Sequence, residues 1–153
     1  MTDFYSTPTG HRPVPSLRIA GSADVDDIAR TVVVAYRNDA PAAVLTQAIA
    51  AARREEAALR IVVFSTDSPA GPMDNDPAET EELAGILAEA AVPFEIQRAD
   101  SDVASQILDL AEEWAAELIV LSTRRRSTMM KLLLGSSIQR VILEADCPVL
   151  VVK

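Results

Sequence analysis

The chain has 153 residues, of which 49% are hydrophobic, and a formal net charge of −9 at pH 7. This length and apolar content indicate a single folded domain with a packed core and exclude a disordered chain. The acidic charge argues against nucleic-acid and membrane binding, because both normally need a basic surface.

The single cysteine, Cys147, excludes an internal disulfide. Its apolar surroundings before Pro148 predict a small buried residue rather than a redox sensor. No apolar run approaches the length of a membrane span, and the N-terminus lacks the pattern of a signal peptide. We therefore expect the protein to reside in the cytoplasm.

Residues 1–30 are predicted to form a flexible N-terminal arm, followed by one α/β domain over residues 31–153. Pro8, Pro13 and Pro15 lie among Ser, Thr and Gly in this arm. The segment 24–30 is interpreted as a solvated lead-in rather than a helical turn.

Short apolar runs then alternate with amphipathic helical segments. The runs predict five strands, at Thr31–Tyr36, Leu59–Phe64, Val92–Ile96, Leu118–Leu121 and Val149–Val152. Strict alternation favours an α/β fold with a doubly wound, five-stranded parallel sheet, order 3-2-1-4-5, and helices on both faces. Pro93 and the polar alternation that follows place the third strand at an edge.

Polar residues before the helices are candidate caps for the free N–H groups. Asp39 is expected to cap the first helix, Asp100 or Ser101 the third, and a serine after Gly135 the last. The run Arg124–Arg126, at the end of the fourth strand, is either an anion clamp or a solvated loop, and the pattern does not decide between them. The run Met129–Leu134 is predicted to pack onto the sheet or across a dimer.

Several of these segments together resemble the universal stress protein family, over residues 31–153. The resemblance is carried by Val34-Ala35, residues 116–121, Leu133–Ser136 and Cys147–Val152. It implies a five-stranded parallel sheet, a dimer, and membership of either a nucleotide-binding or a non-binding group. Binding members carry a glycine, two residues, a second glycine, nine residues and then Gly-Ser or Gly-Thr, with an acidic residue after the first strand.

This chain departs from that binding pattern at three positions. Gly135 and Ser136 match its end, but Ser122 and Arg125 stand where the two glycines are expected, and Arg37 replaces the acidic residue. A guanidinium only donates hydrogen bonds, so Arg37 cannot accept one from an adenine amino group. An arginine in a left-handed backbone position would cost roughly 1 kcal/mol or more.

We therefore predict a stress-associated regulatory or interaction module with weakened or absent ATP binding. The alternative is an ATP- or AMP-binding member whose arginine-rich loop contacts the phosphates. In either case the expected binding residues are Ala35, Arg37, Ser122, Arg124, Arg125, Gly135, Ser136 and Ser137.

No catalytic or metal-binding arrangement is predicted. His11 is the single histidine and lies in the arm, and the carboxylates are scattered over helix faces. Slow nucleotide hydrolysis stays open, although no base is assigned to it. The apolar last strand, Val149 to Val152, is expected to pair across a two-fold axis in a homodimer. An unidentified protein partner is a further expectation.

Overall fold

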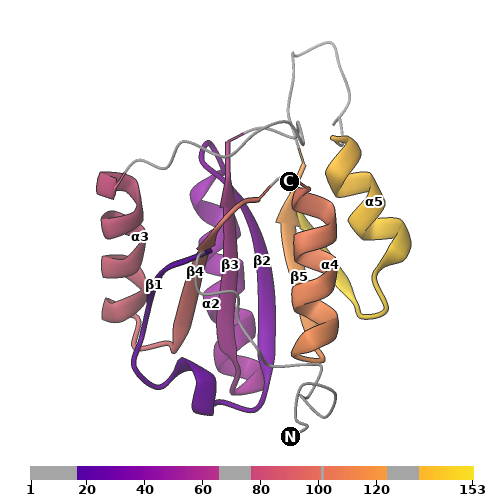
Figure 1. Cartoon of the computed structure of the whole chain (residues 1–153). Coiled ribbons are helices and arrows are strands. Elements are labelled where there is room, and N and C mark those ends of the chain that lie inside the picture. The colour runs from indigo at the N-terminus through magenta and orange to yellow at the C-terminus, as the bar shows by residue number, and fades with distance from the viewer. Residues whose placement is uncertain (1–16, 66–76, 101, 124–134) are drawn as a thin grey trace, which may run out of the picture.

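The computed structural model describes residues 17–65, 77–100, 102–123 and 135–153. Strands and helices alternate along nearly the whole of this part of the chain (Figure 1). The elements are β1 (Arg18–Gly21), the 3₁₀ helix η1 (Val25–Asp27), β2 (Thr31–Arg37), α2 (Ala42–Glu55), β3 (Ala58–Phe64), α3 (Pro77–Glu89), β4 (Phe94–Arg98), α4 (Val103–Glu113), β5 (Leu118–Ser122), α5 (Ser136–Glu144) and β6 (Val149–Val152).

The strands form one six-stranded sheet with the order β1-β4-β3-β2-β5-β6. β2 is central and pairs in parallel with β3 on one side and β5 on the other. Only β1 runs antiparallel, against β4, among the strands that the structure describes. The α/β fold and the order predicted for the five parallel strands are confirmed.

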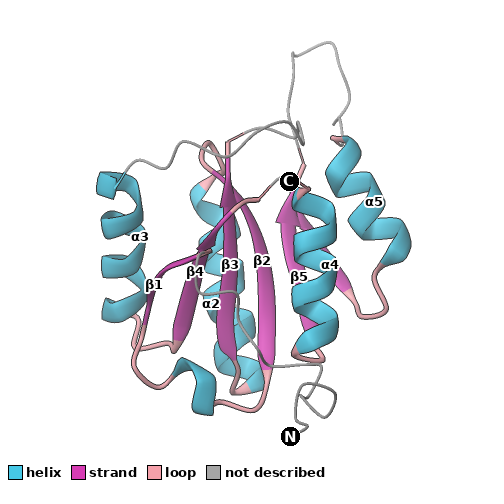
Figure 2. Cartoon of the chain, viewed as in Figure 1, coloured by secondary structure: helices cyan, strands magenta, loops and turns pink. Residues whose placement is uncertain are grey.

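Helices cover both faces of the sheet, as Figure 2 shows with the strands in magenta between cyan helices. α2 and α3 pack on one face, over a core that includes Val34, Ile61 and Leu87. α4 and α5 pack on the other face, over a core that includes Ile107 and Ile138. The alternating side chains of each strand therefore enter two separate cores, which is why the strands are apolar throughout.

The sixth strand was not predicted. β1 lies at residues 18–21, inside the segment assigned to the arm, and η1 follows within the predicted lead-in. Because β1 pairs with β4, the prediction that the third strand of the parallel sheet lies at an edge is wrong. The polar residues that suggested an edge, Glu95 and Gln97, are buried instead.

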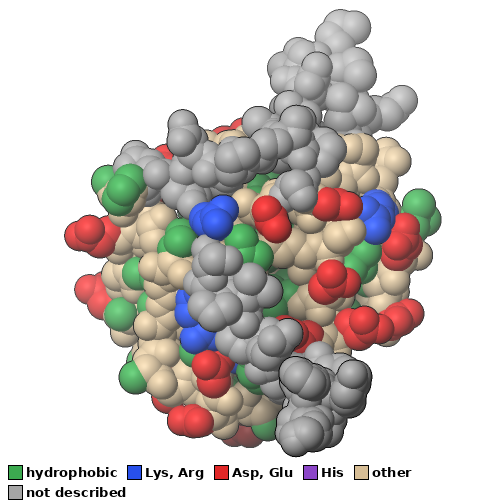
Figure 3. All heavy atoms as spheres, in the orientation of Figure 1, with side chains coloured by type: hydrophobic (Ala, Val, Ile, Leu, Met, Phe, Trp, Pro, Cys, Tyr) green, Lys and Arg blue, Asp and Glu red, His purple; other side chains and the backbone are tan. Residues whose placement is uncertain are grey.

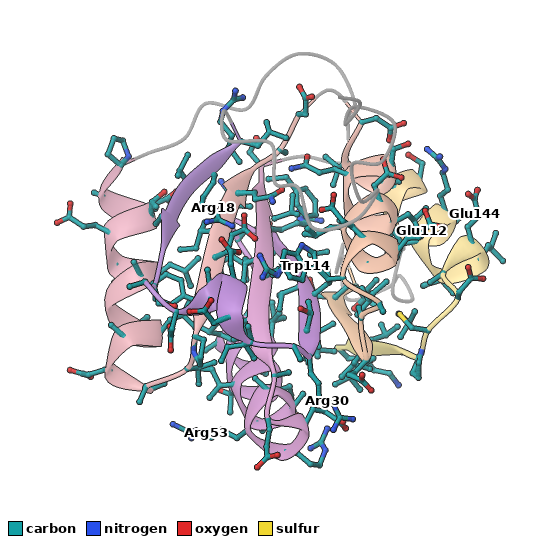
Figure 4. All side chains as sticks on the ribbon, turned by 60° about the horizontal axis from the view of Figure 1, so that its bottom comes forward. Arg18, Arg30, Arg53, Glu112, Trp114 and Glu144 are labelled. Carbon is teal, nitrogen blue, oxygen red and sulfur yellow. The ribbon has the colours of Figure 1, made fainter. Side chains whose placement is uncertain are left out.

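These buried polar residues belong to a charged network on the α4 side of the sheet. Arg60 and Glu95 are register partners on β3 and β4, both fully buried, and they form an ion pair. Glu95 also accepts a hydrogen bond from Arg18 Nε at 2.7 Å, so an ion pair ties β1 to the core. Figure 4 labels Arg18 and Trp114. The Arg60 guanidinium lies over the Trp114 ring, 3.4 Å from its centroid, and donates to Val25 O at 3.1 Å.

The helix caps differ from those predicted. α2 has Pro41 at its N-cap without a side-chain cap, because Asp39 pairs with Arg37 instead. α4 is capped by Asp102, which accepts from Ser105 N at 3.1 Å, rather than by Asp100. Ser101, the other predicted cap, lies outside the described residues.

The last helix also lacks the predicted cap. The N-cap residue of α5 is Gly135, which has no side chain to cap the helix. Cys147, predicted to be buried, is half-buried. In the described residues no helix is long and apolar enough to cross a membrane. His11, Arg124–Arg126 and Met129–Leu134 lie outside the described residues.

Candidate functional site

The strand order reverses between β2 and β5, and this reversal positions the candidate site. The chain leaves β2 through α2 towards β3 on one side, whereas β5 and β6 lie on the other side. In an open parallel sheet, such a point leaves a crevice beyond the carboxyl ends of the two strands. Arg37 ends β2 and Ser122 ends β5, so the structure brings these two predicted residues to the same end of the sheet.

Arg37 is held by Asp39 through two hydrogen bonds. Its Nε donates to Asp39 Oδ1 at 3.0 Å and its Nη2 to Oδ2 at 2.9 Å, the fork geometry of a strong arginine–carboxylate pair. A tight turn makes this contact possible, because Ala40 N donates to Arg37 O at 2.9 Å. The Arg37 side chain is 10% exposed and that of Asp39 66%, so the guanidinium lies inside and its carboxylate partner faces solvent.

The N-terminus of α5 is the second element at this end of the sheet. Gln139 N donates to Gly135 O at 2.9 Å, which is the first hydrogen bond of the helix. The N–H groups of a first helical turn have no acceptor within the helix and carry a partial positive charge, so they favour anions. Ser136 is exposed at this position, whereas Ser137 is buried.

Ser122 and Ala35 are buried and adopt ordinary strand geometry. Ser122 is the register partner of Val152, and its φ is not positive, so serine in place of glycine causes no strain here. Ala35 packs in the core beneath α4 and α5 and offers the crevice no polar group. Arg124 and Arg125 lie outside the described residues, so the expected strain at Arg125 is not tested.

A second charged cluster links α4 to α5. Arg140 Nη1 donates to Asp102 Oδ2 at 3.1 Å, and Arg140 Nη2 donates to Ser105 Oγ at 3.1 Å. The Ser105 N–H, the Ser105 hydroxyl and Arg140 together hold the pKa of the Asp102 carboxyl below its usual range. The cluster fixes the first turn of α4 against α5, which is the helix that supplies the free N–H groups.

Asp39 and Arg140 are the residues of this region that the sequence analysis missed. Asp39 was assigned to a helix cap, although its place two residues after a strand-ending arginine allows the observed pair. Asp102 followed by Ser105 has the spacing of a capping motif and could have located the start of α4. The sequence indicates only the pairing of Arg140 with Glu144 four residues on, because Asp102 and Ser105 lie on another helix.

The described groups at this end of the sheet have the chemistry of an anion-binding site. Asp39 neutralises the charge of Arg37, so the guanidinium can attract an anion only when the ligand displaces the Asp39 carboxylate. In the described ranges no group of three or more His, Cys, Asp or Glu residues could hold a metal ion. The crevice therefore combines a neutralised guanidinium, a helix N-terminus and small buried residues.

Comparisons with known proteins agree with this geometry. The model of the universal stress protein family matches residues 29–153. A solved universal stress protein from Archaeoglobus fulgidus is 29% identical with a TM-score of 0.63, and the match covers 81% of this chain and 98% of that chain. A second one from the same organism, in complex with dAMP, is 25% identical with a TM-score of 0.59, over 82% of this chain and 99% of that chain.

A curated relative, a universal stress protein of Mycolicibacterium smegmatis, is 41% identical over 76 residues, which make up 49% of this chain and 58% of the relative. The chain spans less than two thirds of each curated relative that it matches. The family model, by contrast, spans every parallel strand of the sheet. The sheet order, the crevice and this match lead to one conclusion: the chain belongs to the universal stress protein family.

Proposed function

We propose that the protein is a stress-associated regulatory or interaction module that acts by binding rather than catalysis, with weakened or absent affinity for ATP. The observation that carries the proposal is the paired state of Arg37. A donor-only group stands at the end of β2, where an adenine amino group would need an acceptor, and Asp39 already occupies its fork. An adenine amino group at this position would therefore meet a guanidinium that cannot accept its hydrogen bond and that is already paired with Asp39.

Thermal unfolding with increasing ATP and magnesium tests this proposal. A ligand at 100 times its Kd stabilises the native state by about 2.7 kcal/mol. For a domain of this size that corresponds to a rise in Tm of roughly 5–10 °C. We expect a rise below about 1 °C at millimolar ATP, which is the effect of a ligand present below its Kd.

Two variants make the test specific. Arg37→Asp restores an acceptor at the end of β2 and is expected to increase the response to ATP. Asp39→Asn removes the charge that neutralises Arg37 but adds no acceptor for adenine. A large ATP response in the unmodified protein, unchanged by either variant, would contradict the proposal.

The second candidate function is ATP or AMP binding, with arginines on the phosphates. The start of α5 favours it, because Gly135 and the exposed Ser136 are present in the order expected at a phosphate-binding helix N-terminus. The relative from Archaeoglobus fulgidus in complex with dAMP shows that a similar fold accepts an adenine nucleotide. Under this alternative, Asp39→Asn should strengthen binding by leaving Arg37 free for a phosphate.

We also propose a homodimer paired through β6. Ile119 N donates to Pro148 O at 3.0 Å and Thr123 N to Val152 O at 3.2 Å, so the backbone of alternate residues faces β5. The N–H and C=O groups of Val149 and Val151 then face the opposite edge, where no described strand pairs with them. Antiparallel pairing with a second copy would satisfy both residues.

Replacing Val151 with proline tests the dimer, since it removes an outward N–H and spares the hydrogen bonds to β5. Light scattering should give a mass near twice 16.4 kDa for the unmodified protein and near 16.4 kDa for Val151→Pro, with unchanged helical circular dichroism. Leu150→Pro is the matched control, because it removes an inward N–H and should unfold the edge. A monomeric unmodified protein would contradict this proposal. Residence in the cytoplasm stays a prediction.

A further inference from the structure

A groove lies between the C-terminal half of α4 and the segment that follows α5. Its volume is about 440 Å³, within the usual range for binding sites. Helices in a parallel α/β sheet run opposite to the strands, so the ends of α4 and α5 lie at the amino ends of the strands. The groove is thus at the opposite end of the sheet from the crevice and does not depend on whether a nucleotide binds there.

The floor of the groove is apolar and built from small residues. Leu108 and Ala111 supply it from α4, and Ala145 and Cys147 supply it from the segment after α5. α4 ends at Glu113, Ala115 two residues later has a φ of 48° that turns the chain away, and Ala116 N donates back to Ala111 O at 2.8 Å. Alanines at this helix end leave room that larger side chains would have filled.

The rim of the groove is acidic. Four exposed carboxylates surround it: Asp109, Glu112, Glu144 and Asp146. Figure 4 shows Glu112 on α4 and Glu144 on α5 at the same side of the molecule, and Figure 3 shows acidic side chains gathered over these two helices.

Three of these carboxylates have no ion-pair partner in the described part of the chain. Glu144 pairs with Arg140 at 3.3 Å, and Arg140 is also held by Asp102. No cation among the described residues pairs with Asp109, Glu112 or Asp146. An apolar floor surrounded by unpaired carboxylates repels anions and complements a ligand with an apolar centre and a cationic border.

We propose that this groove binds a basic amphipathic helix of a partner protein. Apolar side chains of such a helix would enter between Leu108 and Cys147, and its lysines or arginines would reach the four carboxylates. The small alanines allow its backbone to approach α4 closely. The charge complementarity selects this occupant over a nucleic acid, which the rim repels.

The test uses a synthetic peptide of about five helical turns, or roughly 18 residues, with leucines on one face and lysines on the other. A peptide of the same composition, scrambled so that it has no apolar face, is the control. Cys147 is the single thiol of the chain and lines the groove, so its alkylation rate reports occupancy. Burial and the neighbouring Asp146 raise the pKa of this thiol, so the reaction is followed at mildly alkaline pH.

We expect the amphipathic peptide to slow alkylation of Cys147 at least fivefold at saturation and the scrambled peptide to leave it nearly unchanged. Glu112→Gln combined with Asp146→Asn should weaken peptide binding about threefold to tenfold, measured by fluorescence anisotropy. The matched control is Glu81→Gln combined with Glu89→Gln on α3, which changes the net charge equally at exposed sites away from the groove. This control should weaken binding less than twofold.

Three other results would overturn the proposal. Equal weakening by both pairs of substitutions would show attraction by net charge alone. Equal protection by the scrambled peptide or by spermine would show a site for any polycation. Protection of Cys147 that grows with protein concentration in the absence of peptide would assign the groove to a second copy of this chain.

Discussion

The buried ion pair of Arg60 and Glu95 allows a strong test of the electrostatic account of the core. Both side chains are 0% exposed, and Glu95 accepts from three donors, on Arg18, Arg60 and Gln97. Glu95→Leu would leave the Arg60 guanidinium in the core with Asp26, itself about half exposed, as the nearest anion. Removing one partner of a buried pair costs about 3–5 kcal/mol.

The second single variant, Arg60→Met, is expected to cost less. Glu95 would keep its bonds from Arg18 and Gln97, so no bare charge is left inside. The loss is the ion pair itself, offset because Arg18 still neutralises Glu95, together with the contact with Trp114 and the bonds to Val25 O and Asp26. We expect this loss to be about 1–3 kcal/mol. The double variant replaces the pair with apolar side chains and should lie within about 2 kcal/mol of the unmodified protein, more stable than Glu95→Leu alone.

Urea denaturation measures these differences. With a slope of about 2 kcal/mol per molar, Glu95→Leu should lower the midpoint by roughly 2 M. The matched surface control is Glu55→Gln, which breaks a 3.2 Å pair with Arg30, a side chain that is 50% exposed. It should cost less than about 1 kcal/mol. If Glu95→Leu costs no more than this control, or if the double variant is the least stable of the series, the reasoning is wrong.

Three further predictions concern local features. The lowered pKa of Asp102 means that its carboxylate stabilises the fold at pH values above the ordinary pKa of 3.8. This stabilisation is lost as the pH falls through the lower pKa of the folded state. Asp102→Asn should therefore reduce the loss of stability at acid pH, measured as the free energy of unfolding against pH. Glu56, the residue that follows α2, has a φ of 54°, so Glu56→Gly should remove strain of roughly 0.5–1 kcal/mol and raise Tm by a few degrees. Thr31 Oγ1 is buried without a hydrogen-bond partner in the described structure, so Thr31→Val should stabilise the protein against urea by about 1 kcal/mol.

The five parallel strands could be predicted because each is a short apolar run between helical segments. Their order follows from right-handed crossovers and short connections. β1 could not be predicted in the same way. It has four residues, RIAG, of which two are exposed, and its anchor is the long-range contact between Arg18 and Glu95, 77 positions away. The propensities of neighbouring residues do not reveal a short strand whose contacts, the backbone pairing with β4 and the bond from Arg18 to Glu95, all lie far away in the sequence.

The structure places Arg37 and Ser122 at the carboxyl ends of β2 and β5, and Gly135 at the start of α5. That these residues form a ligand site stays a prediction. The pairing of Arg37 with Asp39 depends on side-chain direction after a strand, which a linear pattern leaves open. The burial of Glu95 was missed for the same reason. Its polarity was interpreted as the sign of an edge strand, because alternation shows that one face of a strand is polar but not whether other side chains cover that face.

The two proposed interfaces differ in chemistry, and this difference makes them separable. Arg18 and Arg60 are balanced by Asp26 and Glu95 inside the fold, so the net charge of −9 belongs to the remaining, largely exposed, charged residues. Two copies that approach through the apolar edge β6 therefore repel each other over a distance set by the Debye length, which falls from about 10 Å at 0.1 M salt to about 3 Å at 1 M. Salt should strengthen dimerisation, because pairing through β6 uses backbone hydrogen bonds and valines.

The groove between α4 and α5 should respond in the opposite direction. Its four carboxylates are exposed, so their attraction for a basic helix is screened by the same salt that relieves repulsion between copies. A titration of salt, followed by light scattering for the dimer and by anisotropy for the peptide, should give opposite slopes. Parallel slopes would mean that one surface serves both contacts, because a single interface cannot be strengthened and weakened by the same ions.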